Sequence, residues 1–206
     1  MASAAAVSAT TVAPGPSPAP APARERLLQA ALARFESEGA LSATLEDIRR
    51  DAGVSVGALY HHFPDKAALA AALYVDLTAR FQEGFLAALR SHAGAEDGVK
   101  ACVRFYLRWV SADRAAASFL LAGRPDDQAA LRERNRGFFA EVTAWWDTHV
   151  HYGALRPLPF DLIHALWLGP ASEYARHWIA GRAKRVPASI SDVLAEAAWQ
   201  ALKEAR

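Results

Sequence analysis

From Arg24 to near its end, the chain carries apolar residues at the spacing of α-helices. Leu28, Leu32 and Phe35, for example, recur every three or four residues and therefore share one helix face. No stretch of any length alternates between apolar and polar residues, so we expect no β-strands. The sequence predicts an all-α fold of about nine helices, and glycine or proline stands at most of the expected breaks.

Breaks in this spacing divide the chain into helices of unequal length. The longest expected helix begins after Pro64 and repeats an apolar residue at every fourth position up to Leu89. Further helices are expected over about 99–110, 114–122, 127–151 and 160–181. The last of these contains Gly169-Pro170, and because proline lacks a backbone donor we expect a kink there. A final helix is expected after Pro187.

The composition narrows the class of protein. The 206 residues include a single cysteine, Cys102, which excludes an intramolecular disulfide and is typical of a reducing cytoplasm. No run of about 18 apolar residues occurs, so we expect neither a membrane span nor a membrane partner. The formal net charge of +1 does not by itself indicate nucleic-acid binding.

Residues 1–23 differ from the rest of the chain. They contain five prolines and no charged side chain. Such a segment buries too little apolar surface to offset its ordering entropy, so we expect a disordered Ala/Pro-rich tail. The segment also lacks the basic start of a secretory signal peptide, and the expected location is therefore cytoplasmic.

Two short helices joined by a tight turn are expected between Thr44 and Pro64. Thr44 and Ser55 stand where a hydroxyl side chain caps the N-terminus of a helix. Gly53 can take a left-handed conformation between the helices without steric cost, and Pro64 closes the second helix. This arrangement is a helix-turn-helix candidate, a motif whose second helix enters the major groove of DNA.

The outward face of the second short helix is suited to DNA. A serine hydroxyl, free backbone N–H groups and the positive helix end all favour a phosphate at Ser55. Lys66 lies in the first turn of the next helix, where a bound anion would offset its unfavourable position. Arg49 and Arg50 add positive charge close by. The residues expected to face outward are Ser55, Val56, Gly57, Tyr60, His61 and His62.

The pattern T-x-x-D-I…A-G-V-S-x-G-x-L-Y-x-H-F-x-x-K, from Thr44 to Lys66, resembles the DNA-binding signature of the tetracycline-repressor (TetR) family of bacterial transcription regulators. The match extends over about residues 24–77. The resemblance implies DNA contacts, chiefly to phosphates, from Thr44, Ser55, Val56, Gly57, Tyr60, His61, His62 and Lys66. Arg49 stands where the family usually has alanine, so it either crowds the helix packing or adds a phosphate contact.

Two further departures concern base recognition. Val56 stands where a lysine or arginine is frequent in the family, so a charged base contact is missing. A valine could instead touch the methyl group of a thymine. Ala58 likewise replaces a threonine or asparagine. We therefore expect phosphate contacts to supply most of the affinity and binding to depend strongly on salt.

All six tryptophans lie after residue 100, in a region rich in other aromatic residues. Core packing accounts for several of them, but an aromatic lining with a few polar groups is also the usual form of a small-molecule site. The resemblance implies such a pocket in the helices after residue 69, for a flat and largely apolar effector. The predicted lining residues are Phe105, Trp109, Phe119, Trp145, Trp146, His149, His164, Trp167 and Tyr174.

The final helix has a wide apolar face with small residues that permit close approach. The resemblance implies that the last two helices of two chains form a four-helix interface in a homodimer. The predicted interface residues are Trp178, Ile190, Val193, Leu194, Ala197 and Ala198. A two-fold symmetric dimer matches a palindromic operator on double-stranded DNA, with half-sites ~34 Å apart.

These expectations combine into one functional hypothesis. Residues 24–68 form a helix-turn-helix DNA-binding domain, and residues 69–206 form a ligand-binding and dimerisation domain. The predicted protein is a repressor that a small effector releases from its operator. A transcriptional activator or a ligand-independent regulator is the alternative, and a helical small-molecule-binding protein without a DNA role is a distant one. No activated nucleophile, paired carboxylates or metal-ligand spacing is recognisable, so we expect no enzyme, metal or cofactor.

Overall fold

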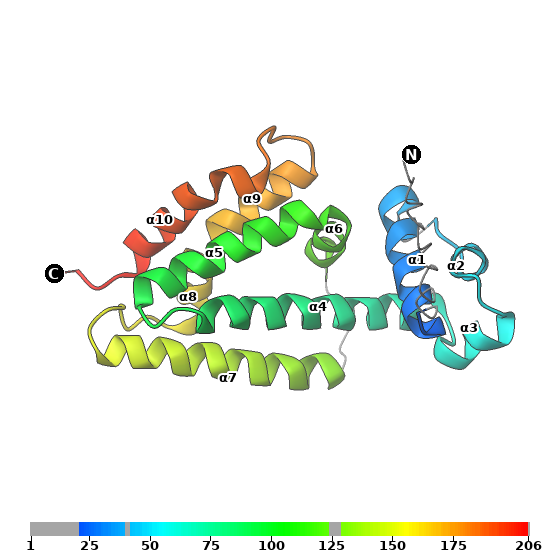
Figure 1. The fold of residues 1–206 in the computed structure, drawn as a ribbon, viewed down its shortest axis with the longest axis horizontal. Coiled ribbons are helices and arrows are strands. Elements are labelled where there is room, and N and C mark those ends of the chain that lie inside the picture. Colours follow the sequence, from blue (N-terminus) through cyan, green and yellow to red (C-terminus); the bar gives the residue numbers. More distant parts are fainter. Residues whose placement is uncertain (1–20, 40–41, 124–128, 206) are drawn as a thin grey trace, which may run out of the picture.

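The computed structural model describes residues 21–39, 42–123 and 129–205. Within these ranges the chain is all-α, as expected, with one isolated β-bridge between Leu155 and Lys203 and no strand. Residues 1–20 of the expected tail lie outside the described ranges. The helices, shown in Figure 1, are α1 (Ala23–Glu38), α2 (Leu45–Ala52), α3 (Val56–His62), α4 (Lys66–Arg90), α5 (Ala95–Ala112), α6 (Arg114–Ala122), α7 (Ala129–His151), α8 (Phe160–Trp167), α9 (Gly169–Ile179), the 3₁₀ helix η1 (Pro187–Ile190) and α10 (Ser191–Leu202).

The first three helices pack around one apolar core at one end of the molecule (Figure 1). Leu27 and Phe35 of α1, Ile48 of α2 and Leu59 of α3 are buried in that core. The turn between α2 and α3 has the expected glycine geometry, because Gly53 lies in the left-handed region at φ 62° and ψ 39°. Local capping and apolar spacing thus produce the helix-turn-helix.

α4 connects this end of the molecule to the rest (Figure 1). Its Leu69, Leu73 and Leu77 belong to the N-terminal core, whereas Phe85 and Leu89 belong to the larger second core. The expected domain boundary at residue 68 falls inside the first turn of α4. A single long helix therefore shares its apolar stripe between both cores.

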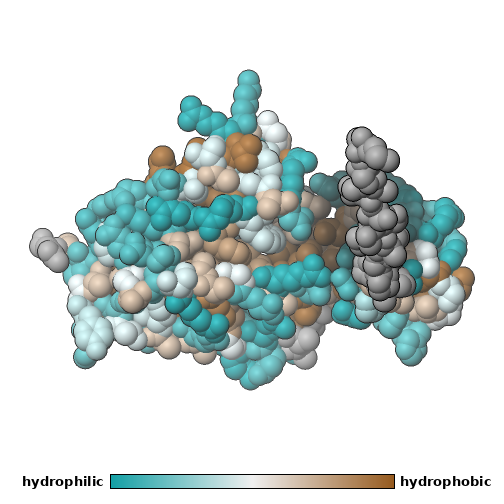
Figure 2. Space-filling model, viewed as in Figure 1, coloured by the Kyte–Doolittle hydropathy of each residue, from teal (hydrophilic) through white to brown (hydrophobic). Residues whose placement is uncertain are grey.

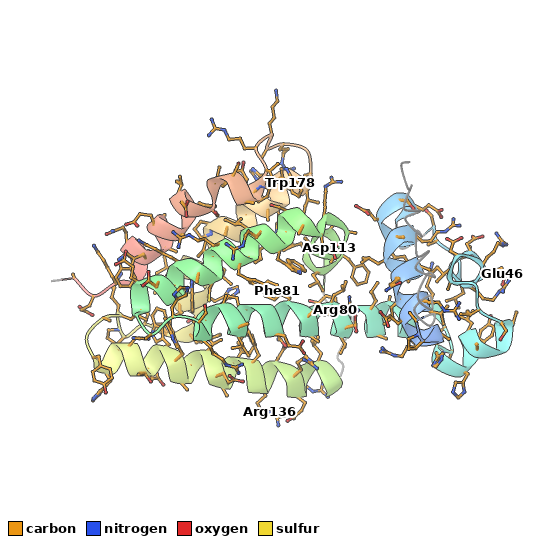
Figure 3. All side chains as sticks on the ribbon, in the orientation of Figure 1. Glu46, Arg80, Phe81, Asp113, Arg136 and Trp178 are labelled. Atoms are coloured by element: carbon orange, nitrogen blue, oxygen red, sulfur yellow. The ribbon has the colours of Figure 1, made fainter. Side chains whose placement is uncertain are left out.

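In the larger half, α5 lies between α4 on one side and α9 and α10 on the other, while α7 covers the opposite side of α4 (Figure 1). Val99, Val103 and Leu107 of α5 are fully buried in the second core. Phe81 of α4 fills the space between α4 and α5 (Figure 3), where its ring contacts the ring of Trp109 at a centroid distance of 5.1 Å.

The structure differs from the sequence-based expectation at three helix ends. The expected kinked helix over 160–181 is two helices, because Leu168 at φ −108° and ψ −13° separates α8 from α9. Pro170 therefore lies in the first turn of a new helix, a position where its missing N–H costs nothing. α5 begins at Ala95 rather than near residue 99, and the 3₁₀ turn η1 precedes α10.

Hydrophilic residues cover most of the face seen in Figure 2, and apolar residues gather where α6 faces α1. Within the described ranges, none of the helices combines the length and apolar character that crossing a membrane requires.

Candidate nucleic-acid interface and ligand cavity

α3 is held at its N-terminus by Ser55, whose hydroxyl accepts a hydrogen bond from the Ala58 backbone N–H at 3.2 Å. One face of this seven-residue helix is buried through Leu59. Away from that buried side, two large side chains are open to solvent, because Val56 is 53% exposed and Tyr60 is 56% exposed. These two residues are four positions apart and therefore share one face of α3.

Gly57 lies beside Val56 on α3. Apart from the neighbouring backbone of α3 itself, a Cβ atom added there would meet none of the described residues within 4 Å. Packing within this chain therefore does not require a glycine at position 57. A partner that approaches the α3 backbone closely is a physical reason for one.

The other predicted DNA-contacting residues surround α3. His61 and His62 are exposed, with ring centroids 5.1 Å apart. Thr44 caps α2 and accepts from the Asp47 backbone N–H at 3.2 Å. Lys66 begins α4 and donates from Nζ to the Ala43 carbonyl at 3.1 Å, so it lies beside Thr44. The N-terminal ends of α2 and α4 are thus brought together.

Arg49 has partners within the chain. Its Nη1 donates to the Val54 carbonyl at 2.7 Å, and its Nη2 pairs with Glu46 Oε1 at 2.6 Å. The bond to Arg49 holds the pKa of the Glu46 carboxyl below its ordinary value. Glu46 lies on the outer side of α2 (Figure 3). Arg49 therefore ties α2 to the turn before α3, and it packs without crowding the helices.

Three further arginines of this domain also have hydrogen-bond partners within the chain. Arg50 Nη1 lies 3.0 Å from Asp47 Oδ1, and Arg34 Nη2 donates to Asp51 Oδ1 at 3.0 Å. Arg26 Nη1 donates to the Ala52 carbonyl at 3.0 Å, across the turn from α1. Arg34 and Arg50 are thus paired with neighbouring acids, whereas Arg26 is held by a backbone carbonyl.

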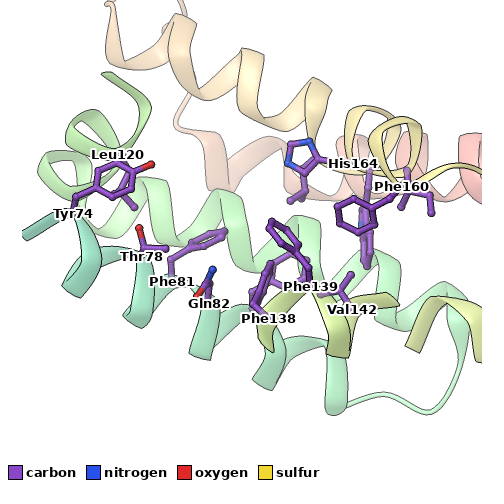
Figure 4. A pocket seen from close by; sticks show the side chains of 14 residues that line it. Tyr74, Thr78, Phe81, Gln82, Leu120, Phe138, Phe139, Val142, Phe160 and His164 are labelled. Atoms are coloured by element: carbon purple, nitrogen blue, oxygen red, sulfur yellow. The ribbon is translucent and has the colours of Figure 1, made fainter. Parts of the chain in front are cut away.

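A cavity of about 220 Å³ lies in the larger half, between α4, α6, α7 and α8 (Figure 4). Among the described residues that line it, seven are aromatic, and Thr78, Gln82 and His164 add polar groups. The lining residues are Tyr74, Thr78, Phe81, Gln82, Phe85, Leu120, Phe138, Phe139, Val142, Phe160, Ile163, His164, Trp167 and Leu168.

Only His164 and Trp167 of the nine predicted pocket residues line this cavity. Phe105 and Trp109 pack against Phe81 from α5 instead. Trp145 and Trp146 lie behind Trp167, with ring centroids 5.9 Å and 5.8 Å from it.

The other three predicted residues make contacts away from the cavity. His149 meets the edge of Trp145 at a centroid distance of 4.3 Å. Phe119 stacks on Phe35 of α1, and the Tyr174 hydroxyl donates to the Arg185 carbonyl at 2.9 Å. The phenylalanines of α4 and α7 take their place at the cavity. Their spacing at every fourth position of α4 was visible in the sequence, but it is also the spacing of core residues.

The predicted dimer residues divide between the outer and inner faces of α9 and α10. Val193 is 71% exposed, and Ala197 is exposed on the same helix. Ala198 instead faces the core and is 3% exposed, because α10 packs that side against α5. Ile190, Leu194 and Trp178 are half-buried, and the Arg114 guanidinium lies 5.7 Å from the Trp178 ring.

Among the described residues, no group of three or more His, Cys, Asp or Glu side chains is placed to hold a metal ion. Cys102 is buried, and burial raises the pKa of its thiol well above the ordinary value.

Known sequences match the N-terminal part of the chain. Residues 27–73 match the family model of the bacterial regulatory proteins of the tetR family. The HTH-type transcriptional regulator BetI of Rhizobium meliloti (strain 1021) is 32% identical over 85 residues, which are 41% of this chain and 42% of BetI. SrpR of Pseudomonas putida is 49% identical over 43 residues, which are 21% of this chain and 20% of SrpR. The match thus spans at most 42% of the length of these two curated relatives.

Solved structures resemble the fold over most of its length. A TetR family transcription regulator from Marinobacter aquaeolei VT8 has a TM-score of 0.75 at 17% identity, over 89% of this chain and 96% of that one. FadR from Bacillus subtilis, solved in complex with stearoyl-CoA, has a TM-score of 0.73 at 17% identity, over 84% of this chain and 96% of that one. Residues 27–73 thus carry the signature of the tetR family of bacterial regulatory proteins, and the fold over most of the chain is similar to that of solved TetR family regulators.

Proposed function

We propose that this protein is a cytoplasmic, dimeric transcriptional repressor that binds a palindromic operator through α3 and leaves it when a small apolar molecule fills the cavity. The open face of α3 carries this proposal. Val56 and Tyr60 project from a capped helix whose other side is buried, and the position of Gly57 between them leaves the backbone accessible. A helix presented in this way fits the major groove.

Operator recognition is testable by selection from random double-stranded DNA. We expect the selected sequences to share a two-fold symmetric motif, with half-site centres roughly one or more helical turns apart. Affinity should fall steeply with salt, because phosphate contacts release counterions. Selected sequences without symmetry would contradict the dimeric mode, and the absence of any enrichment would contradict sequence-specific binding.

The dimer would use the exposed side of α9 and α10. Val193 is 71% exposed and Val186 is 47% exposed, and large apolar side chains left in water favour an interface. Val193→Arg should shift the protein from dimer to monomer in light scattering and lower operator affinity. Tyr152→Arg is the control, because Tyr152 is 77% exposed in the turn after α7 and belongs to neither α9 nor α10. Equal behaviour of the two variants would place the interface elsewhere.

Release by an effector requires that one conformational change both improves effector binding in the cavity and weakens DNA binding by α3. An effector that binds the DNA-free state more tightly lowers operator affinity by the coupling energy, typically ~1–3 kcal/mol. Operator affinity measured with and without a cavity ligand tests this. An unchanged operator affinity at saturating ligand would favour the ligand-independent alternative, and a raised one would favour an activator.

A further inference from the structure

Gln82, one of the residues that line the cavity, has a polar atom without a partner in the described part of the chain. Gln82 lines the cavity from α4 and is 6% exposed. Its Nε2 donates to Asn135 Oδ1 at 2.8 Å, whereas its Oε1 is buried without a hydrogen bond. A buried acceptor without a hydrogen bond is energetically unfavourable. A hydrogen bond from an occupant to Oε1 would therefore strengthen the binding of that occupant.

The wall around Gln82 is otherwise unsuited to charge. None of the described residues that line the cavity is Asp, Glu, Lys or Arg. A charged occupant would therefore lose its hydration without gaining a counter-ion, which is strongly unfavourable in an apolar site. The cavity consequently favours a neutral molecule.

The rings of the wall favour an aromatic occupant. In Figure 4, Gln82 lies between Phe81 and Phe138. Phe138 meets Phe139, and Phe139 meets Phe160, each pair edge to face at a centroid distance of 5.2 Å. Aromatic rings prefer such edge-to-face or offset contacts, so a flat ring can extend this series.

The volume limits the size of the occupant. The cavity measures about 220 Å³. An engineered apolar cavity of ~150 Å³ in another protein takes benzene, and sites for drug-sized ligands begin at ~300 Å³. One substituted ring or two fused rings therefore fit between these limits.

We propose that the cavity takes a neutral aromatic molecule of one or two rings that donates one hydrogen bond to Gln82 Oε1, as a phenol, naphthol or indole does. This inference rests on the proposed effector site and adds its chemical class. Gln82 acts as the residue that discriminates donors from hydrocarbons of the same shape.

Matched probe pairs test the inference by calorimetry on the full chain. The first pair is indole and indene, and the second is 2-naphthol and naphthalene. In each pair the shape is nearly equal and only one member donates a hydrogen bond. We expect the donor to bind roughly tenfold more tightly than its partner, since the hydrocarbon leaves Oε1 unpaired.

Gln82→Met keeps the length of the side chain and removes the acceptor. Its former partner Asn135 is only half-buried, so water can replace the lost bond there. The variant should bind both members of each pair with equal affinity and should bind the hydrocarbon at least as tightly as the wild type does. Asn135→Ala is the matched control, because it removes the other end of the same hydrogen bond and should preserve the preference for the donor.

Three other outcomes would each refute one part of the inference. Equal affinity for both members in the wild-type protein would refute the donor class. Tighter binding of phenyltrimethylammonium than of tert-butylbenzene would refute the neutral class. No binding of any probe would refute the cavity as a site for such molecules. Operator binding without probe is measured on the same samples, so a failure of the DNA-binding proposal is seen separately.

Discussion

The ring of Phe119 in α6 stacks on the ring of Phe35 in α1, with centroids 5.6 Å apart and planes 12° from parallel. Phe119 also meets Tyr74 of α4 at a centroid distance of 6.4 Å. Tyr74 and Leu120, the residue after Phe119, both line the cavity. α6 therefore contacts α1 through Phe119 and lines the cavity with the following residue, Leu120.

This arrangement predicts that Phe119 transmits the state of the cavity to α1. Phe119→Ala should leave probe binding and operator binding intact when each is measured alone. The coupling between them should fall from a typical ~1–3 kcal/mol toward zero. Operator affinity with and without 2-naphthol measures this coupling. Tyr152→Ala, at a highly exposed site, is the control and should retain it. Undiminished coupling in Phe119→Ala would assign transmission to another contact.

A second prediction separates folding from DNA binding at Gly57. Gly57 and Gly137 are both exposed in helices, and an added Cβ at either meets nothing within 4 Å. Alanine in place of a helical glycine stabilises by about 1 kcal/mol, so both Gly→Ala variants should be more stable in urea denaturation. Only Gly57→Ala should weaken operator binding, because its methyl group stands where the DNA approaches.

Two results with these variants would contradict the prediction. Equal operator affinity in Gly57→Ala and Gly137→Ala would show that DNA does not approach α3 at this position. A loss of stability in Gly57→Ala alone would mean that the glycine serves the fold instead.

The helix-turn-helix was predictable from the sequence because its determinants are local. Thr44 and Ser55 each accept a hydrogen bond from the backbone N–H three residues ahead, and Gly53 adopts its left-handed conformation within one turn. The roles of the arginines were less accessible. Arg49 reaches the Val54 carbonyl only because the turn folds back toward α2.

The cavity could not be located from the sequence, because helix-to-helix distances decide it. Gly98 lets Trp145 pack so closely that a Cβ on the glycine would lie 2.5 Å from Trp145 Cζ2. That contact helps to place Trp145 outside the cavity, on the far side of Trp167. Phe81 and Phe85 follow the same four-residue spacing as the leucines of α4. The sequence therefore did not distinguish residues that line the cavity from residues of the core.

Val56 predicts a specific contact to thymine. The side chain is 53% exposed and apolar on the open face of α3. If it touches a thymine methyl group, replacing that thymine by deoxyuridine should lower wild-type affinity by about 0.8 kcal/mol, the value of one buried methyl or methylene group. Val56→Ala should be insensitive to the same replacement. A scan of single deoxyuridine substitutions through the operator measures both. A wild-type protein that is insensitive at every position would contradict the contact.

The last prediction concerns pH. Burial lowers the pKa of His149, whose ring meets the edge of Trp145. The unfolded chain therefore binds this proton more tightly than the folded one, so protonation favours unfolding. The free energy of unfolding should be at its full value above the unfolded pKa of ~6.5 and should decrease as pH falls toward the folded pKa. His149→Gln should flatten this part of the profile in urea denaturation at a series of pH values. His151→Gln, at an exposed position on the same helix, serves as the control and should keep the wild-type slope. A wild-type slope in His149→Gln would assign the pH dependence to other groups.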